Sequence, residues 1–557
     1  MRDLLALLLC LLCLHGMQGV LGAAVGTDSL LLGLQAALAR SPPKTPATKR
    51  LVSSDDADQV AWPKEVLLGA GLSAAQAEGA YNEDGKGMSL LDYKSSIPGA
   101  FSTDMHVAAD HYHRFREDLH LAKQMKFTSH RFSIAWSRVL PTGGVDNINE
   151  KGVKFYKDYI DEVIKNGMVP MVTMLHFDQP YVVEDVTGGW GSPEMIDRYV
   201  EYADFLFKTF GEKVKYWNTI NEPNMYCHYF RNKKNTTNPQ EEPYYPCMHN
   251  IIIAHAKTYR LYKNKYQAKQ KGKVGTSVVM WPATPKTTRS EDVMASETFN
   301  QLFAGTLVHP LVFGDYHPLL RYLVDKHDAE EGVTTPRLPE LTTEEKQLLA
   351  GGTTDFIALN VYSKCTASYN HNQTSSAQES VLLGPVMRDM PFVEVTGIGD
   401  FSATEESLMQ DALMWTWSNY HTPIIISENG YGDSQHLGVK DTARAAYLSV
   451  NLRTLARTIK EYDVEVLAYY VWALMDVWEF TAGYLERPFG LIHVDYENGS
   501  LNRTLKDSAK FFIELGTSGI VPSVPAPENG GISSSSTSVT ATGLLLSALW
   551  LAIRPMT

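Results

Sequence analysis

The sequence predicts an α/β fold, a (β/α)8 TIM barrel that forms a single domain over residues 61–516. Short apolar runs rich in β-branched residues alternate there with longer helix-like segments, which is typical of parallel strands joined by helices. Eight such runs are present, the number that closes this barrel. The alternative, an open doubly wound sheet, usually carries a glycine-rich phosphate loop after an early strand. The chain has no loop of that spacing.

The expected strands, in chain order, are residues 66–69, 128–134, 168–175, 214–221, 274–280, 355–361, 423–427 and 466–472. Helical patterns lie between them, for example in residues 196–210, 250–267 and 442–461. Trp415, Trp417 and Tyr420 are expected to be core aromatics of the helix before the seventh strand.

The composition is that of globular material, with 44% apolar and 20% charged residues. The formal net charge is −13, and no basic stripe with interleaved aromatics is present. Nucleic-acid binding is therefore not expected. His111 and His113 flank Tyr112 and suggest a metal pair, but on a strand this spacing would put them on opposite faces, so we expect a structural role instead.

Residues 1–24 have the features of a secretory signal peptide. Arg2 precedes an almost unbroken run of Leu, Ala and Cys from Leu4 to Leu14, and small residues follow. A signal anchor is the alternative, but the run is shorter than the roughly 20 residues of a membrane span. We expect entry into the secretory pathway, an extracellular or cell-surface location, and a flexible leader at residues 25–60.

Residues 517–557 combine a Pro/Gly/Ala-rich stretch, a Ser/Thr-rich spacer and a short apolar tail. This order is the pattern of a glycosylphosphatidylinositol signal, and a disordered secreted tail is the alternative. Any membrane contact is expected only through such a lipid anchor.

Three cysteines lie beyond the signal: Cys227, Cys247 and Cys365. In an oxidising compartment Cys227 and Cys247 are the expected disulfide, which closes a local loop and leaves Cys365 free. Without clustered histidines these cysteines make no zinc site. Glycosylation tripeptides, expected on surface loops, stand at Asn235, Asn372, Asn498 and Asn502.

Two glutamates are expected at the carboxyl ends of strands. The run Ile424-Ile425-Ile426 leads into Glu428, and the fourth strand leads into Glu222. Catalytic groups of parallel barrels are placed at these ends, and a carboxylate there is costly to desolvate without a partner. Glu428 is therefore a candidate nucleophile. Two carboxylates that flank one bond are the minimum equipment for glycoside hydrolysis, with retention at a separation of about 5–5.5 Å and inversion at wider spacing.

The segments Thr219-Ile220-Asn221-Glu222-Pro223 and Ile426-Ser427-Glu428-Asn429-Gly430 resemble the two signature motifs of glycoside hydrolase family 1. This β-glucosidase family includes lactase-like and Klotho-like members. The likeness extends from about residue 66 to about residue 512. Other family-like segments are residues 73–79, 131–138, 176–180, 355–362, 472–476, 483–484 and 487–491.

The resemblance implies an exo-acting O-glycosyl hydrolase that retains configuration through a covalent glycosyl-enzyme and needs no metal or organic cofactor. It implies Glu428 as nucleophile and Glu222 as the acid and then the base. Arg131 and the Tyr362 hydroxyl would keep Glu428 ionised, whereas Glu222 would need a raised pKa. The sugar-binding residues implied are Gln76, His176, Asn221, Tyr362, Trp472, which would supply a stacking face, Glu479 and Phe480.

The chain departs from the family pattern at three positions, which usually hold Trp, Asn and Trp where this chain has Phe177, Val477 and Phe480. Residues 401–409 also lack the usual Pro-x-Gly. A Trp-to-Phe change removes an indole N–H, worth on the order of 0.5–1.5 kcal/mol when it binds a sugar hydroxyl. The glycone is therefore left open among β-glucoside, β-galactoside and β-fucoside.

Two alternatives lie within the same resemblance. A Klotho-like binding or co-receptor protein would lack one or both glutamates, and this chain has both. Some thioglucosidases replace the acid with Gln, because a thiol-derived leaving group needs little protonation. The presence of Glu222 disfavours a thioglucosidase of that kind. A thioglucosidase that retains the glutamate stays open as an alternative.

Overall fold

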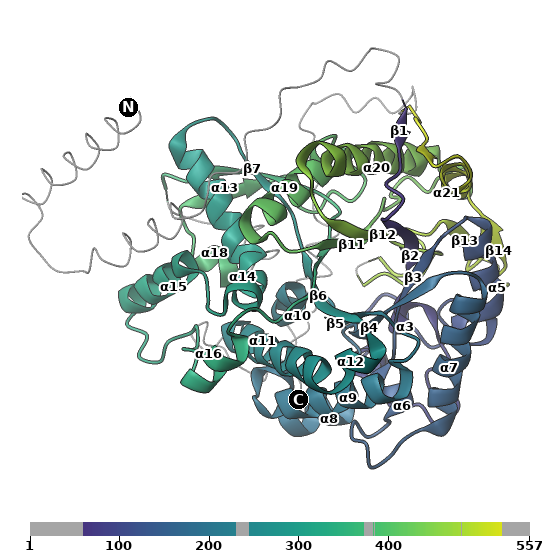
Figure 1. Cartoon of the computed structure of the whole chain (residues 1–557), viewed down its shortest axis with the longest axis horizontal. Helices are drawn as coiled ribbons and strands as arrows, with labels where there is room; N and C mark the ends of the chain where they lie inside the picture. The colour runs from purple at the N-terminus through teal and green to yellow at the C-terminus, as the bar shows by residue number, and fades with distance from the viewer. Residues whose placement is uncertain (1–58, 230–243, 373–382, 384, 481, 526–557) are drawn as a thin grey trace, which may run out of the picture. The chain divides into compact units, whose positions relative to one another are not determined.

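The computed structural model describes residues 59–229, 244–372, 383, 385–480 and 482–525, and its centre is a closed barrel of parallel strands (Figure 1). The order around the barrel is β11-β12-β2-β3-β4-β5-β6-β8. All eight predicted runs are strands of this barrel, so the predicted fold is confirmed. The barrel strands are β2 (Leu67–Gly71), β3 (Ser129–Ser133), β4 (Val169–Leu175), β5 (Tyr216–Ile220), β6 (Lys273–Val279), β8 (Ile357–Asn360), β11 (Ile424–Asn429) and β12 (Val466–Val471).

Helices connect successive strands and cover the outside of the barrel (Figure 1). Their apolar faces pack on the outward side chains of the strands in one large core. The helical segments are α3 (Ala74–Ala77), α4 (Leu90–Ser96), α5 (His111–Gln124), α6 (Trp136–Val139), α7 (Glu150–Lys165), α8 (Tyr181–Thr187), η1 (Gly189–Gly191), α9 (Glu194–Phe210), α10 (Pro223–Tyr229), α11 (Tyr244–Leu261), η3 (Tyr262–Tyr266), α12 (Gln267–Gln270), α13 (Ser290–Phe303), α14 (Gly305–Phe313), α15 (Pro318–Glu331), α16 (Thr343–Leu349), α18 (Pro385–Arg388), α19 (Leu408–Tyr420), α20 (Thr442–Tyr462) and α21 (Asp507–Ser518).

A second, smaller cluster of buried side chains fills the barrel itself. Its members come from β4, from the neighbouring strands β8, β11 and β12, and from the residue before β8: Met171, Phe356, Ala358, Ile425, Ala468 and Tyr470. Because side chains alternate along a strand, each strand gives one set to this interior and the other to the helices. The alternation matters most on β3, where His130 and Arg131 point to opposite sides.

Short strands outside the barrel tie down its connections. An antiparallel pair joins the two ends of the described barrel region, β1 (Val60–Ala61) with β15 (Ile520–Val521). A three-stranded sheet has the order β10-β9-β7, and β13 pairs with β14. Their bounds are β7 (Ala283–Pro285), β9 (Cys365–Tyr369), β10 (Val393–Thr396), β13 (Ile492–Val494) and β14 (Arg503–Leu505).

The predicted disulfide is present. Cys227 on α10 is bonded to Cys247 on α11, and Cys365 is buried with a free thiol. Asn372, Asn498 and Asn502 are exposed, whereas Asn235 lies outside the described residues. The predicted signal peptide, nearly all of the leader and residues 526–557 of the predicted C-terminal tail also lie outside them. Among the helices described, none is long and apolar enough to cross a membrane.

One local prediction was wrong. The segment that contains His111 and His113 begins helix α5 and is not a strand. His111 is buried, with ring nitrogens 2.7 Å from Asp118 Oδ2 and 2.9 Å from Tyr159 Oη, which is a structural setting. The helix before β11 was predicted correctly: α19 carries Tyr420 buried and Trp415 and Trp417 half-buried against the core.

Removing the disulfide tests its contribution to stability. Replacing Cys227 and Cys247 by Ala frees a loop of 20 residues, so we expect the free energy of unfolding to fall by about 3 kcal/mol. Urea denaturation of both proteins measures the change. Cys365→Ala is the control, since it truncates a buried cysteine and leaves the disulfide intact. An unchanged denaturation midpoint in the double variant would contradict the prediction.

Candidate active site

The two predicted catalytic glutamates both lie at the carboxyl end of the barrel. Glu222 lies two residues after Ile220, where β5 ends. Glu428 is the penultimate residue of β11. Strands β6 and β8 lie between β5 and β11 in the ring. Glu428 is 4% exposed, and Glu222 is half-buried. This is the end of a parallel barrel at which catalytic residues are found.

Glu428 is held by two strong hydrogen bonds. Arg131 Nη1 donates to Glu428 Oε1 at 2.7 Å, and Tyr362 Oη donates to Oε2 at 2.6 Å. Arg131 is fully buried on β3, so this is a buried ion pair. Charge-assisted bonds to both oxygens fix the orientation of the carboxylate.

Asn221 connects this ion pair to the neighbouring strands. Its Oδ1 accepts hydrogen bonds from Arg131 Nη2 at 2.7 Å, Ser277 Oγ at 3.0 Å and Asn360 Nδ2 at 3.2 Å. Three donors on one oxygen settle which way the amide points. The Nδ2 group therefore faces His176 Nε2, 3.2 Å away.

Glu222 has a very different environment, without a cation. Asn360 Nδ2 donates to Glu222 Oε1 at 2.7 Å. Burial and the negative charge of Glu428 raise the pKa of Glu222 to about 8, against the smaller opposing effects of Asn360 and Arg131. The two glutamates therefore share one hydrogen-bond network, but only Glu428 has an ion-pair partner in it.

A second polar group surrounds Glu479, after the end of β12. Trp472 Nε1 donates to Glu479 Oε1 at 3.2 Å, and Gln76 Nε2 donates to Oε2 at 3.4 Å. Burial, with a smaller contribution from the Glu428 charge, raises the pKa of Glu479 to about 8. Gln76 is itself fixed, because Nε2 donates to Trp478 O at 2.7 Å and Oε1 accepts from Ser73 Oγ at 2.6 Å.

Aromatic rings line the same region. The rings of His176 and Trp472 lie nearly parallel, with centroids 5.8 Å apart. Phe177 and Phe480 meet edge to face at 5.5 Å, and Phe480 also contacts Trp478 at 5.1 Å. Burial and the charge of Arg131 hold the pKa of His176 well below its usual range, so its ring is neutral. Because Nε2 accepts from Asn221, the proton of His176 is on Nδ1.

The structure therefore places the predicted site residues in two connected groups. One group holds Arg131, His176, Asn221, Glu222, Tyr362 and Glu428, and the other holds Gln76, Trp472, Glu479 and Phe480. Sequence reasoning missed Asn360, which binds both Asn221 and Glu222 and accepts from Ser427 Oγ at 2.6 Å. The available signal was its position at the carboxyl end of a predicted strand, two residues before Tyr362.

This arrangement defines a class of enzyme. One carboxylate is paired with a buried arginine, and a second has a raised pKa at the same end of a parallel barrel. Such a pair divides the roles of nucleophile and acid in the cleavage of a glycosidic bond. Fold and site together are those of a barrel glycoside hydrolase.

Comparison with known proteins gives the family. Residues 58–519 match Glycosyl hydrolase family 1. Myrosinase 1 of Brevicoryne brassicae is 34% identical over 82% of this chain and 99% of its own length. Beta-glucosidase 11 of Arabidopsis thaliana is 34% identical over 81% and 91%, respectively. The chain belongs to glycosyl hydrolase family 1. It is an O-glycosyl hydrolase, a retaining β-glycosidase.

Solved structures agree with this membership. The aphid myrosinase superposes with a TM-score of 0.75 at 32% identity, over 82% of this chain and 99% of its own. A mutant of the rice Os3BGlu6 β-glucosidase, captured in a covalent complex with glucose, superposes with a TM-score of 0.73 at 30% identity over 82% and 99%. Proteins named myrosinase and β-glucosidase match equally well in sequence, so the thioglucosidase alternative is not favoured.

The buried ion pair can be tested through stability. Arg131→Met leaves Glu428 without its cation, so we expect the free energy of unfolding to fall by about 3–5 kcal/mol. Adding Glu428→Gln to that variant should restore at least half of the loss, because no buried charge is then left unpaired. Denaturant unfolding of wild type, the two single variants and the double variant measures the coupling energy between Arg131 and Glu428. If the losses of the single variants simply added up in the double variant, the prediction would be contradicted.

Proposed function

We propose that the chain hydrolyses terminal β-linked hexosides, with β-glucosides first and β-galactosides and β-fucosides as related substrates. Glu428 is the nucleophile, and Glu222 is the general acid and then the base. The observation that carries these roles is the single network in which Arg131 binds Glu428 while Glu222 has only the neutral Asn360.

In the first step, the Glu428 carboxylate attacks the anomeric carbon of the sugar. Arg131 and Tyr362 orient it and are its two donors. The protonated Glu222 gives its proton to the glycosidic oxygen, and the leaving alcohol departs. The product is a glycosyl ester of Glu428.

In the second step, the roles of Glu222 reverse. Ester formation removes the negative charge of Glu428, which is one of the two causes that raise the pKa of Glu222. The pKa of Glu222 therefore falls in the intermediate, and Glu222 becomes a competent base. It takes a proton from water, which attacks the anomeric carbon and releases the sugar with its original configuration.

The glycone is bound by the polar groups around Glu479 and His176. Phe177 and Phe480 offer no ring N–H, so hydroxyl groups on that side are bound by Gln76 and Glu479. Trp472 supplies an aromatic face for the apolar C–H side of the ring. Asn221 Nδ2, beside the nucleophile, is placed to bind the hydroxyl next to the anomeric carbon.

Substitution of each glutamate tests the assignment. Glu428→Gln should lower kcat at least about 10⁴-fold on every substrate, because no nucleophile remains. Glu222→Gln should lower kcat/KM by about 10²–10⁴-fold on alkyl glycosides and much less on dinitrophenyl glycosides, whose leaving group needs no proton. Loss of the base should still lower kcat on dinitrophenyl glycosides, because hydrolysis of the glycosyl ester is then slow.

The measurement is a panel of aryl and alkyl β-glucosides, β-galactosides, β-fucosides and β-mannosides with an S-glucoside. Glu394→Gln, an exposed glutamate on β10, is the matched control. If wild type turned over none of these substrates, or Glu428→Gln matched it, the proposal would be wrong. A glucoside rate below the galactoside and fucoside rates would correct the glycone order alone.

The pH dependence follows from the raised pKa of Glu222. The acid must be protonated in the free enzyme, so kcat/KM should fall as the pH rises through about 8. Hydrolysis of an alkyl β-glucoside measured from pH 5 to 10 gives the profile, and a dinitrophenyl glucoside serves as the comparison with little need for the acid. A rate that falls already near pH 5, or that stays constant to pH 10, would be inconsistent with Glu222 as the acid.

A further inference from the structure

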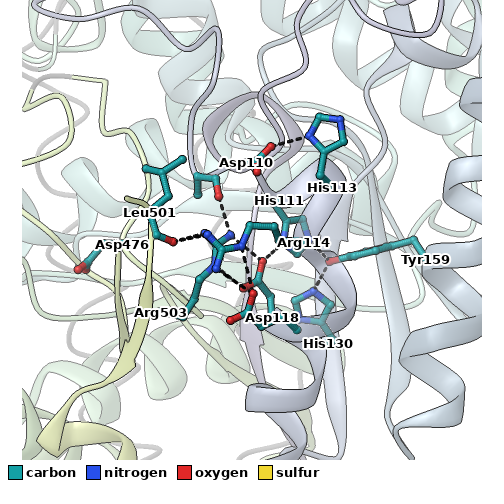
Figure 2. Close-up of polar contacts among 12 residues, drawn as sticks. Asp110, His111, His113, Arg114, Asp118, His130, Tyr159, Asp476, Leu501 and Arg503 are labelled. Carbon is teal, nitrogen blue, oxygen red and sulfur yellow. Dashed lines mark hydrogen bonds and ion pairs between the residues drawn. The ribbon is translucent and has the colours of Figure 1, made fainter. Parts of the chain in front are cut away.

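A buried chain of polar side chains lies behind β3, on the side away from the catalytic glutamates. Figure 2 shows Tyr159 of α7 between the rings of His111 and His130. Its Oη is 2.9 Å from His111 Nε2 and 2.8 Å from His130 Nε2. His130 belongs to β3 and precedes Arg131, and its Nδ1 lies 2.9 Å from the carbonyl oxygen of Ala70 in β2.

The chain continues from His111 to a second ion pair (Figure 2). His111 Nδ1 lies 2.7 Å from Asp118 Oδ2. Arg503 of β14 donates to Asp118 through Nε at 2.8 Å and Nη2 at 3.1 Å. Asp118 and the Arg503 side chain are fully buried, and His111 and Tyr159 are nearly so. The chain therefore runs without a break from Arg503 to the backbone of β2.

The direction of each hydrogen bond follows from the two ends. The carbonyl of Ala70 can only accept, so His130 Nδ1 carries a proton. Burial and the charge of His111 lower the pKa of His130 to about 3, so its ring is neutral and Nε2 has a lone pair. Tyr159 must therefore donate its one proton to His130, and its oxygen is left to accept from His111 Nε2–H.

The same argument from the other end fixes the second nitrogen of His111. Burial alone would raise the pKa of Asp118, but the hydrogen bonds from His111 and Arg503 hold it below its usual range, so the group is ionised. His111 Nδ1 therefore donates to it. Both ring nitrogens of His111 therefore act as donors in this chain. A small cavity beside His111 is also lined by Glu78, the partner of Arg138.

We propose that Tyr159, together with His111 and His130, is a positioning group for Arg131 that fixes β3 from behind at His130. The inference rests on the proposed role of Arg131 beside the nucleophile. His130 and Arg131 are consecutive on one strand and face opposite sides of it. The His130 ring is hydrogen-bonded at both nitrogens, which holds the backbone of β3 against β2 and α7. This also fixes the position of the Arg131 Cα atom, from which its side chain extends.

The geometry on the other side explains why such fixation matters. Arg131 must reach Glu428 Oε1 and Asn221 Oδ1 at once, each at 2.7 Å. A bidentate clamp of this kind tolerates little displacement, and small misplacements of reacting groups lower rates steeply. The expected signature of a loosened β3 is therefore a lower kcat with KM nearly unchanged.

The test uses Tyr159→Phe, which keeps the ring and removes only the hydroxyl. We expect kcat to fall by about 5- to 50-fold with KM within about twofold of wild type. The matched control is Tyr262→Phe, another fully buried tyrosine, whose hydroxyl accepts from Gly272 N at 2.7 Å ahead of β6. It should leave kcat within about twofold. The burst of product in the first turnover counts active enzyme, so misfolded protein does not lower the measured kcat.

A double variant distinguishes positioning through Arg131 from a general structural effect. In an Arg131→Lys background, Tyr159→Phe should lower kcat no further than about twofold, because the group that it positions is already lost. Equal losses in both backgrounds, or wild-type kcat in the single variant, would overturn the inference. Failure of the proposed function appears separately, as a wild type without activity or an active Glu428→Gln.

The protonation of His111 has its own measurement. In protein labelled with ¹⁵N-histidine, the ring signals missing from His111→Gln identify His111. Two protonated-nitrogen shifts near neutral pH are expected. One shift typical of a bare ring nitrogen would overturn the proton order assigned to the chain.

Discussion

The buried guanidinium of Arg131 is the constraint around which the site is built. Desolvating such a charge costs several kcal/mol unless its donors are satisfied. Its Nη groups meet Glu428 from β11 and Asn221 from the end of β5, so strands distant in the ring must present their acceptors at one height. The closed barrel provides this, because all its strands end at the same rim.

The eight strands could be predicted because strands of a parallel barrel are buried on both faces and read as short apolar runs. Glu222 and Glu428 were noticeable as carboxylates at the ends of such runs. The ion pair of Arg131 with Glu428 joins residues 297 positions apart, and no local pattern encodes that contact. The resemblance to the family suggested this ion pair, and the structure shows it directly.

Two features were not found from the sequence. Asp110 stands directly before α5 and is a preferred N-cap residue, but in the structure its backbone is left-handed and its side chain makes no cap bond. His111 and His113 were assigned to a strand. Asn360 was overlooked because an amide has no charge to suggest chemistry. The Asn360 side chain is neutral. It links Asn221 to Glu222 and stabilises the ionised form of Glu222 less strongly than a cation would.

The orientation of Asn221 links the ion pair of Arg131 and Glu428 to the ring of His176. Its oxygen is committed to Arg131, Ser277 and Asn360, which leaves its amide protons for His176. That bond in turn places the His176 proton on Nδ1. Loss of Arg131 would remove the strongest of the three donors and let the amide turn over, so one substitution would disturb both Glu428 and the ring of His176. The hydrogen bonds that begin at Arg131 on β3 therefore fix, with one arrangement of protons, both the Glu428 carboxylate and the ring of His176.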